Sequence, residues 1–475
     1  MPRYAYERLS DHSAAFLKNE TARCIAHATS LQIFDAGPLA AEAGGVDFES
    51  IQRAIAARLH RVPRLRQELR WIPFEKHPVW IDDPDFNLDY HLRHTSLPRP
   101  GGFDQLEKMA ARIMDQRLDR SRPLWECWVL EGMEGGRFAL ILKIHHCMVD
   151  ESGSDLLEVL LSPDPNDPDP EPPPYNPRPQ PSARELVMAE IVHQARLPRR
   201  VFDRAHSVLH SPDKLAWEVE SRARSAAELL GYALRAPMET PLNGEIGRHR
   251  RFRGLGFSLE EARGVRRELG GTIHDVILAV VAGATRTYLL ERLVSPAAVD
   301  FRIATPVGLA AGPSERRVAE WVIDLPVWEK SATARLEHIR AATEKLAAEA
   351  GALPASALLE GDTWFGGRLL SLGARALASH TPVNMMLTNS PGAQVPLYFK
   401  GGRLLEAYGL TPLREHHGLS IAVMSYDGTL FFGLNSDFDV VPDIDRFALA
   451  LRGSFGELVQ AARRADEAGG GSTGA

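Results

Sequence analysis

The residues best suited to chemistry lie in residues 138–154, FALILKIHHCMVDESGS, where an apolar run leads directly into two histidines. An imidazole, with an ordinary pKa of about 6.5, is a natural general base for an alcohol, and a nearby aspartate can fix its tautomer or brace the loop. One isolated histidine at a strand end is usually structural, but a His-His-x-x-x-Asp cluster favours catalysis. We therefore expect His145, His146 and Asp150 to be catalytic.

Strand alternation predicts where these side chains point. One face would carry Phe138, Leu140, Leu142, Ile144 and His146, and the other Ala139, Ile141, Lys143 and His145. The rings of His145 and His146 are then expected to point in opposite directions. Cys147, the next residue, would face away from His146 and could not be activated as a thiol nucleophile.

The elements that must position this cluster form a hairpin followed by an α/β region. Two strands, 124–130 and 138–146, are predicted around a glycine-containing turn, and Ser152 with Asp155 has the spacing that caps a following helix. Downstream helices are expected at 258–269, 272–292 and 333–350, strands at 301–304, 322–327 and 383–388, and a final helix at 443–464. Asp427-Gly428 between strands 419–426 and 429–434 predicts a type I′ hairpin turn.

The domain organisation follows from length and from proline content. A chain of 475 residues is too long for one compact core. Ten prolines between Ser162 and Ser182 exclude helix and sheet there. We therefore predict an N-terminal domain at 1–161, a proline-rich linker with amphipathic helices at 162–240, a C-terminal domain at 241–465 and a disordered tail at 466–475.

Composition limits the partners. With 62 acidic and 55 basic side chains the net charge is -7, which disfavours nucleic acid. The three scattered cysteines indicate neither disulfides nor a zinc site, and no export signal or membrane-spanning segment is apparent. A cytoplasmic enzyme without metal or cofactor is expected.

Several motifs together resemble the bacterial wax ester synthase/diacylglycerol acyltransferase family, whose signature is His-His-x-x-x-Asp-Gly. The matching segments are His145 to Asp150, Leu9-Ser10 through Phe16-Leu17, Pro123-Leu124-Trp125, His274-Asp275-Val276 and Asn389-Ser390-Pro391-Gly392, in the family's order along nearly the whole chain.

The resemblance implies an α/β fold of two chloramphenicol-acetyltransferase-like, or condensation-domain-like, domains with a tunnel at their interface. It also implies acyl-CoA as co-substrate, a long-chain alcohol or diacylglycerol as acceptor, and direct attack without an acyl-enzyme. His146 would be the base, Asp150 a support of the motif loop and His145 a helper. Substrate contacts are expected from Asn389, Ser390, His274, Asp275 and Trp125, with Asn389 and neighbouring backbone amides as oxyanion donors and Trp125 equally suited to core packing.

Two positions depart from the family: Glu151 replaces glycine and His274 replaces asparagine. An alternative is therefore a catalytically impaired, lipid-surface binding homologue. Another is a peptide or polyketide condensation-type acyltransferase, although carrier-protein modules are missing. A serine hydrolase is disfavoured because the Gly-x-Ser-x-Gly match, 470–474, lies in the tail.

The apolar substrates suggest contact with a membrane or lipid droplet. Residues 183–235 predict arginine-rich amphipathic helices, in which Arg196, Arg199, Arg200 and Arg204 lie near Leu197, Val201 and Phe202. Either these helices meet anionic head groups or they pack on the two domains.

Overall fold

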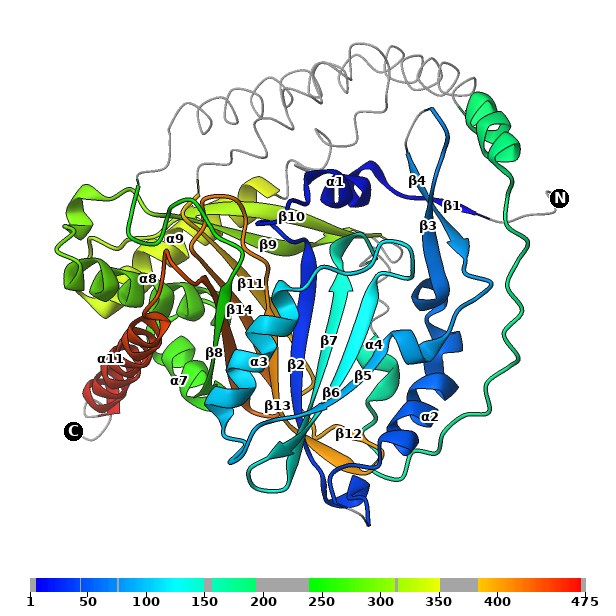
Figure 1. Ribbon diagram of the computed structural model, residues 1–475. Coiled ribbons are helices and arrows are strands. Elements are labelled where there is room, and N and C mark those ends of the chain that lie inside the picture. Colours follow the sequence, from blue (N-terminus) through cyan, green and yellow to red (C-terminus); the bar gives the residue numbers. More distant parts are fainter. Residues whose placement is uncertain are drawn as a thin grey trace.

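The chain folds around two six-stranded mixed sheets that lie next to each other (Figure 1). The computed structural model describes residues 6–42, 44–74, 77–148, 156–193, 239–311, 315–350 and 383–470. Each sheet has its own hydrophobic core of buried residues. The mixed α/β architecture predicted from the sequence is therefore present.

The first sheet contains the predicted histidine strand near its centre. Its order is β12 (Tyr398–Phe399), β13 (Gly402–Leu410), β2 (His27–Asp35), β7 (Arg137–His145), β6 (Trp125–Met133) and β5 (Leu92–Ser96). Two of these strands, β12 and β13, come from the second half of the chain. The predicted C-terminal domain, 241–465, includes β12 and β13, but these strands belong to the first sheet. The prediction missed this because the sequence of a strand does not identify the strand with which it pairs.

The second sheet is built from the C-terminal half. Its order is β10 (Glu315–Asp324), β9 (Arg302–Ala311), β11 (Met385–Pro391), β14 (Leu419–Tyr426), β15 (Thr429–Asp437) and β8 (Arg250–Ser258). A third, small sheet pairs β1 (Glu7–Arg8), β4 (Pro78–Asp82) and β3 (Gln67–Trp71).

Helices cover the two large sheets. The N-terminal half has α1 (Asp11–Asn19), α2 (Phe48–Arg58), α3 (Phe103–Asp115) and α4 (Leu156–Leu160), and the C-terminal half has α7 (Leu259–Leu269), α8 (Ile273–Glu291), α9 (Ala332–Ala350) and α11 (Ile444–Gly470). Helix α8 is long and apolar enough to span a membrane by composition, yet 72% of that stretch is buried. It packs against α9 and α11 as a core helix.

Both predicted hairpins are confirmed. Strands β6 and β7 pair antiparallel with Trp125 opposite Ile144. In the second hairpin, Asp427 and Gly428 both have positive φ, 42° and 79°, as a type I′ turn requires. The capping residues Ser258 and Thr272 also accept the expected backbone N–H groups at the starts of α7 and α8.

One predicted boundary needs correction. Helix α11 continues to Gly470, so residues 466–470 of the predicted disordered tail are helical. These residues continue the long helix that precedes them, and Glu467 and Ala468 are favourable helix residues. The proline-rich segment is extended as predicted, and it is held to the protein by an ion pair between Arg178 and Asp82 and by the hydroxyl of Tyr175, which donates to the carbonyl of Asp83.

Candidate active site

His146 lies at the point where the central strand of the first sheet ends. Strand β7 stops at His145, and His146 begins a 3-10 turn, η5 (His146–Met148). Its backbone N–H donates to the carbonyl of Ala26 at 2.8 Å, and its ring stacks on Phe16 of α1, with centroids 4.9 Å apart and planes at 17°. A partly buried imidazole is thus held in one orientation at a sheet end.

The predicted opposite directions of the two rings are wrong. Alternation applies only within a strand, and the strand ends between His145 and His146. Both rings contact the same segment instead, His146 through Phe16 of α1 and His145 through Glu20, the residue that caps the C-terminal end of α1. Helix α1 with its C-terminal cap therefore fixes both histidines.

The tautomer of His145 follows from its contacts. The ring is 1% exposed, and its Nδ1 accepts the backbone N–H of Cys147 at 3.1 Å. The proton of the neutral ring must then be on Nε2, which lies 3.7 Å from a carboxylate oxygen of Glu20. His145 thus links Glu20 to the turn that carries His146.

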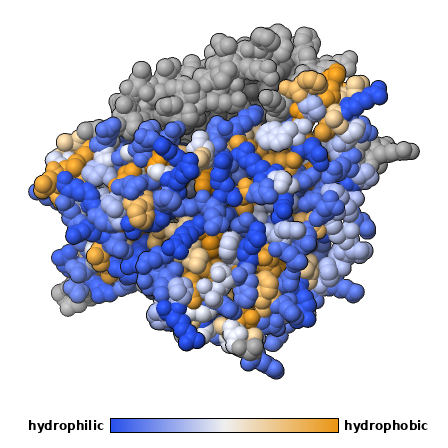
Figure 2. Space-filling view, in the orientation of Figure 1, coloured by the Kyte–Doolittle hydropathy of each residue, from blue (hydrophilic) through white to orange (hydrophobic). Residues whose placement is uncertain are grey.

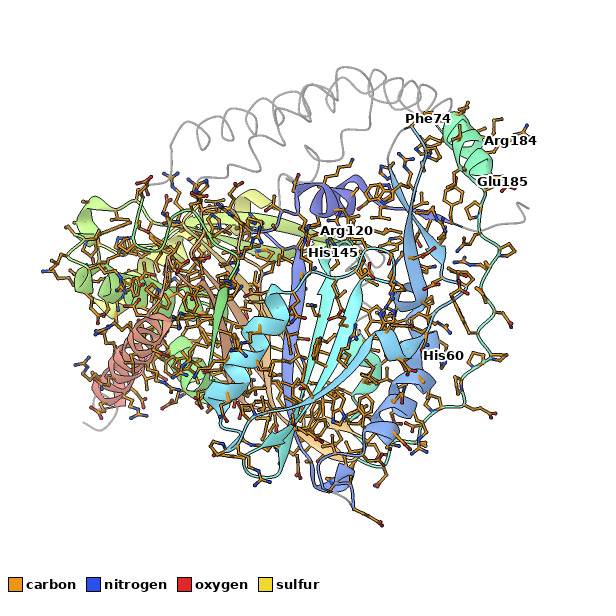
Figure 3. All side chains as sticks on the ribbon, viewed as in Figure 1. His60, Phe74, Arg120, His145, Arg184 and Glu185 are labelled. Atoms are coloured by element: carbon orange, nitrogen blue, oxygen red, sulfur yellow. The ribbon has the colours of Figure 1, made fainter. Side chains whose placement is uncertain are left out.

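Glu20 is the centre of a buried charge cluster. Two of its partners, Arg120 and His145, are labelled in Figure 3. Its carboxylate also contacts His27 at 3.4 Å, Arg117 at 3.5 Å and Arg120 at 2.5 Å, although the side chain is only 2% exposed. Burial alone would raise its pKa, but the contacts with His145 and Arg120 prevail and hold the pKa well below its usual range. Glu20 is therefore an anion in the folded protein.

His27 contributes no charge to this cluster. Burial, reinforced by the positive charge of Lys143, lowers the pKa of His27 to about 2. Its imidazole is therefore neutral at physiological pH. In the register of the sheet His27 lies directly opposite His145, so that the neutral ring fills the space beside the motif.

Cys147 is not placed to act as a nucleophile. Its side chain is 2% exposed, and burial raises the pKa of the thiol far above its usual range. A buried thiol with a raised pKa is not ionised at physiological pH, and only the thiolate is an effective nucleophile.

A second group of predicted residues meets at the second sheet. The side-chain amide of Asn389, on β11, lies 3.4 Å from Nδ1 of His274 at the start of α8. Burial lowers the pKa of His274, so the ring is neutral. Ser390, the next residue after Asn389, is exposed.

Asp275 has a structural role in this group. One carboxylate oxygen accepts from the backbone N–H and the hydroxyl of Thr272, and the other accepts from the hydroxyl of Thr343 at 2.7 Å. These bonds cap α8 and tie it to α9. Asp275 thereby fixes the backbone of the neighbouring His274, while its own carboxylate is fully engaged with the protein.

A short path of contacts connects the two groups. Thr388, next to Asn389, shares a hydrogen bond of 2.9 Å with Thr411. Thr411 directly follows β13, whose last residue, Leu410, lies opposite Thr29 of β2. Strand β2 begins at His27, opposite His145. Since neighbouring strands lie about 5 Å apart, both groups belong to the junction of the two sheets.

The remaining predicted residues are placed as follows. Trp125 is 1% exposed, its indole N–H donates to the carbonyl of Leu65, and its ring stacks on His91, so it packs in the core. Asp150 and Glu151 lie outside the described residues, as does the predicted helix cap at Ser152. Among the described residues, no group of three or more His, Cys, Asp or Glu could hold a metal ion.

Sequence reasoning did not find Glu20, His27, Arg117 and Arg120. They lie 25 positions or more before the first residue of the motif and meet it only through folding. The available signal was weak: an acidic residue follows the N-terminal family match, 9–17, and a histidine opens a strand of mixed polarity.

Comparison with protein families gives two matches that together cover most of the chain. Residues 9–277 match the wax ester synthase/diacylglycerol acyltransferase catalytic domain, and residues 317–459 match the C-terminal domain of the same enzymes. The first match extends past the proline-rich segment and includes His274.

Curated relatives agree with this match. A probable diacylglycerol O-acyltransferase of Mycobacterium tuberculosis is 31% identical over 96% of both chains. A second protein of that organism, a putative diacylglycerol O-acyltransferase, is 32% identical over 94% of this chain and 90% of its own length.

Solved structures share the fold. The wax ester synthase/diacylglycerol acyltransferase from Marinobacter aquaeolei aligns with a TM-score of 0.68 at 24% identity, over 96% of this chain and 99% of its own. The first condensation domain of the calcium-dependent antibiotic synthetase aligns with a TM-score of 0.57 at 15% identity, over 96% of both chains. The condensation-domain-like architecture expected from the sequence is thereby confirmed.

Proposed function

Because the chain belongs to the wax ester synthase/diacylglycerol acyltransferase family and is thus an acyltransferase, we propose that it moves a fatty acyl group from acyl-CoA to a diacylglycerol or a long-chain alcohol, with His146 as the base. The observation that carries this proposal is the fixed position of His146. Its ring is held against Phe16 at the end of the central strand, next to the junction of the two sheets.

The reaction needs one base and one anion-stabilising site. His146 takes the proton of the alcohol while the alcohol oxygen bonds to the thioester carbon, whose carbonyl oxygen gains the negative charge. Collapse of this intermediate breaks the carbon–sulfur bond. The imidazolium of His146 then returns the proton to the departing CoA thiolate. No covalent acyl-enzyme is needed, in keeping with the buried, un-ionised thiol of Cys147.

Substitution of His146 tests this mechanism. We expect His146→Ala to lower turnover by about 10²–10⁴-fold, the usual contribution of a general base. The assay uses radiolabelled acyl-CoA with hexadecanol and, separately, with diacylglycerol, which also determines the preferred alcohol. Turnover close to wild type in His146→Ala would exclude the mechanism, and a wild-type enzyme without turnover on either alcohol would favour the impaired, lipid-binding alternative.

We also propose that the protein collects its apolar substrates at an anionic lipid surface. The predicted arginine cluster, 196–204, lies outside the described residues, but residues 183–193 form a helix with an exposed apolar side comprising Met188, Ile191 and Val192. An apolar area covers this helix in Figure 2. Leu186 packs the helix on β4 and on Ile72, which follows β3. Phe74, at the tip that joins these strands, is 94% exposed (Figure 3).

Liposome flotation tests the surface. Phe74→Ser with Ile191→Ser should reduce binding to anionic vesicles, because two large apolar groups no longer insert into the lipid. Leu293→Ser is the matched control, since Leu293 is 97% exposed but lies after α8, in the other half of the protein. Equal flotation of the double variant and the control would place the lipid contact elsewhere.

A further inference from the structure

His274 presents a hydrogen-bond donor that the protein itself does not use. The amide nitrogen of Asn389, 3.4 Å from Nδ1 of His274, can only donate, so Nδ1 must accept. The neutral ring then carries its proton on Nε2. In the part of the chain that the structure describes, Nε2 is buried and has no hydrogen-bond partner.

An unpaired buried donor is costly and therefore indicates a missing acceptor. The surroundings of His274 make the donor rigid: Asp275 is locked by Thr272 and Thr343, and Asn389 holds the ring from the adjacent sheet. A donor that is oriented in advance and shielded from water is the kind of group that stabilises developing negative charge.

We propose that the Nε2–H of His274 donates to the thioester carbonyl oxygen of the acyl-CoA and stabilises the oxyanion formed during acyl transfer. This inference rests on the proposed function. It assigns the anion-stabilising role chiefly to His274, with Asn389 as the positioning residue that fixes the ring's tautomer. One of the two amide hydrogens of Asn389 is used for that purpose.

The carbonyl oxygen is the acceptor that fits the arrangement. The alcohol oxygen must contact the base, and the base belongs to the first sheet, at the end of β7. His274 and Asn389 belong to the second half, across the junction. They are therefore placed to contact the other reacting oxygen, the thioester carbonyl oxygen that gains negative charge. Burial also keeps the ring neutral, and a neutral imidazole can polarise a carbonyl group.

Two ligands separate this role from a structural one. The first is a long-chain α,α-difluoroketone analogue of acyl-CoA, R–CF2–CO–CH2–S–CoA, whose hydrate carries oxygen at the position of the oxyanion. The second is the S-alkyl thioether of coenzyme A with the same chain length, which has no such oxygen. We expect His274→Phe to weaken binding of the ketone about 10- to 100-fold and to keep the affinity for the thioether within about twofold of the wild-type value. The same variant should lower kcat about 10²–10³-fold.

His274→Gln is the conservative partner, because its amide restores a donor of similar reach. It should recover at least part of the affinity for the ketone and part of kcat. If His274→Phe binds both ligands as the active wild type does, or weakens both equally, the assigned role is wrong. That outcome is distinct from failure of the proposed function, in which the wild type itself transfers no acyl group.

Discussion

Glu20 influences the histidine pair without being placed to touch the substrate. Its anion lies within 3.7 Å of His145, whose ring accepts the N–H of the turn that carries His146. Glu20→Gln removes the charge that holds this arrangement, so we expect kcat to fall about 10- to 100-fold while KM for acyl-CoA changes little. Steady-state kinetics measures both, and Glu20→Asp should recover part of kcat.

Stability should change in the same variant. The pKa of Glu20 is lower in the folded than in the unfolded protein, so its contribution is present above the unfolded pKa, near 4.5, and is lost as the pH falls below it. At pH 7 we expect Glu20→Gln to cost about 1–3 kcal/mol, since Arg117 and Arg120 are partly exposed and can turn to water. Glu245→Gln, in an exposed pair with Arg23, should cost less than about 0.5 kcal/mol. Equal melting temperatures would contradict the role of Glu20.

At the residue scale, the sequence identifies the histidines of the motif better than the residues that hold them in position. His145 and His146 could be found because the motif is contiguous. The direction of the two rings could not be predicted, because it depends on whether the strand ends before or after His146. The strand ends before it, where both rings contact the segment of α1 and Glu20. The carboxylate of Glu20 reaches the motif across more than 100 residues of chain, which no local pattern records.

At the element scale, the N-terminal caps of helices can be predicted from the sequence, because the two residues of a capping box are three positions apart. The box formed by Thr272 and Asp275 at the start of α8 is present as expected. Asp275→Ala should lower the free energy of unfolding by about 2 kcal/mol, because it removes the cap and the bond from Thr343. Ser258→Ala at the exposed cap of α7 is the control and should cost about 1 kcal/mol or less. Denaturant unfolding compares them.

The cap also bears on activity, because His274 immediately precedes Asp275. Below its melting temperature, Asp275→Ala should lose more activity than Ser258→Ala does. Matching losses of stability and activity in the two variants would mean that the α8 cap has no special part in placing His274.

Sheet pairing is the element-scale feature that the sequence did not predict. The strands that were predicted overlap β6, β7, β9, β10, β11, β14 and β15, since alternation and turn residues are local. The other strands, β12 and β13 among them, were not predicted. The transfer of β12 and β13 into the first sheet depends on which edges are available after folding. Their residues, among them Phe399 and Tyr408, complete the core of the N-terminal half, so the two halves cannot be stable independent units.

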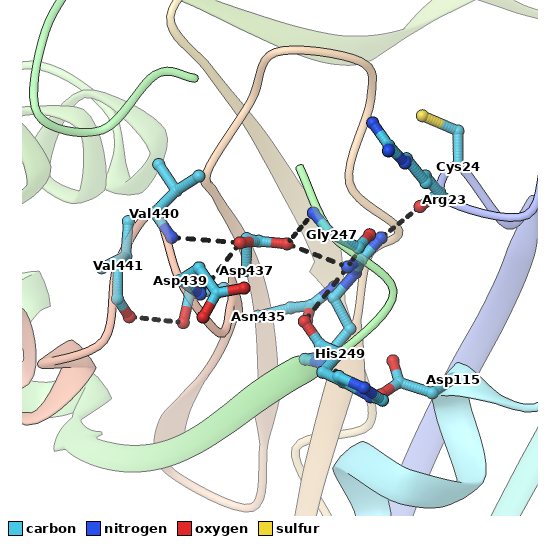
Figure 4. Close-up of polar contacts among 12 residues, drawn as sticks. Arg23, Cys24, Asp115, Gly247, His249, Asn435, Asp437, Asp439, Val440 and Val441 are labelled. Carbon is cyan, nitrogen blue, oxygen red and sulfur yellow. Dashed lines mark hydrogen bonds and ion pairs between the residues drawn. The ribbon is translucent and has the colours of Figure 1, made fainter. Parts of the chain in front are cut away.

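At the scale of the whole molecule, a buried polar joint connects the halves close to the start of β8 (Figure 4). The guanidinium of Arg250 binds Asp437 of β15 and the carbonyl of Arg23, between α1 and β2. The backbone N–H of Arg250 donates to Asp115 at the end of α3, at 3.0 Å. Arg250 therefore joins segments from both halves. Its partner Arg23 lies only three residues after Glu20 in the sequence.

Asp115 makes this joint sensitive to pH. Burial raises the pKa of Asp115 to about 6 in the folded protein, above its ordinary value of 3.8 and despite the N–H and the charge of Arg250. A carboxyl group with a raised folded pKa favours folding while it is protonated, and this contribution is lost as the pH rises through 6. At physiological pH the ionised, buried carboxylate therefore weakens the joint.

Asp115→Asn should remove this penalty, because the amide oxygen can still accept the N–H of Arg250 but carries no charge. We expect the variant to be more stable than wild type above pH 6, by up to about 3 kcal/mol, and the difference to disappear near pH 4. Melting temperatures of both proteins between pH 4.5 and 7.5 measure the trend. Asp104→Asn, on the exposed first turn of the same helix, should show no such pH-dependent gain. A variant less stable than wild type at pH 7.5 would show that the Asp115 carboxylate strengthens the joint through its attraction to Arg250, and that this attraction exceeds the cost of its burial.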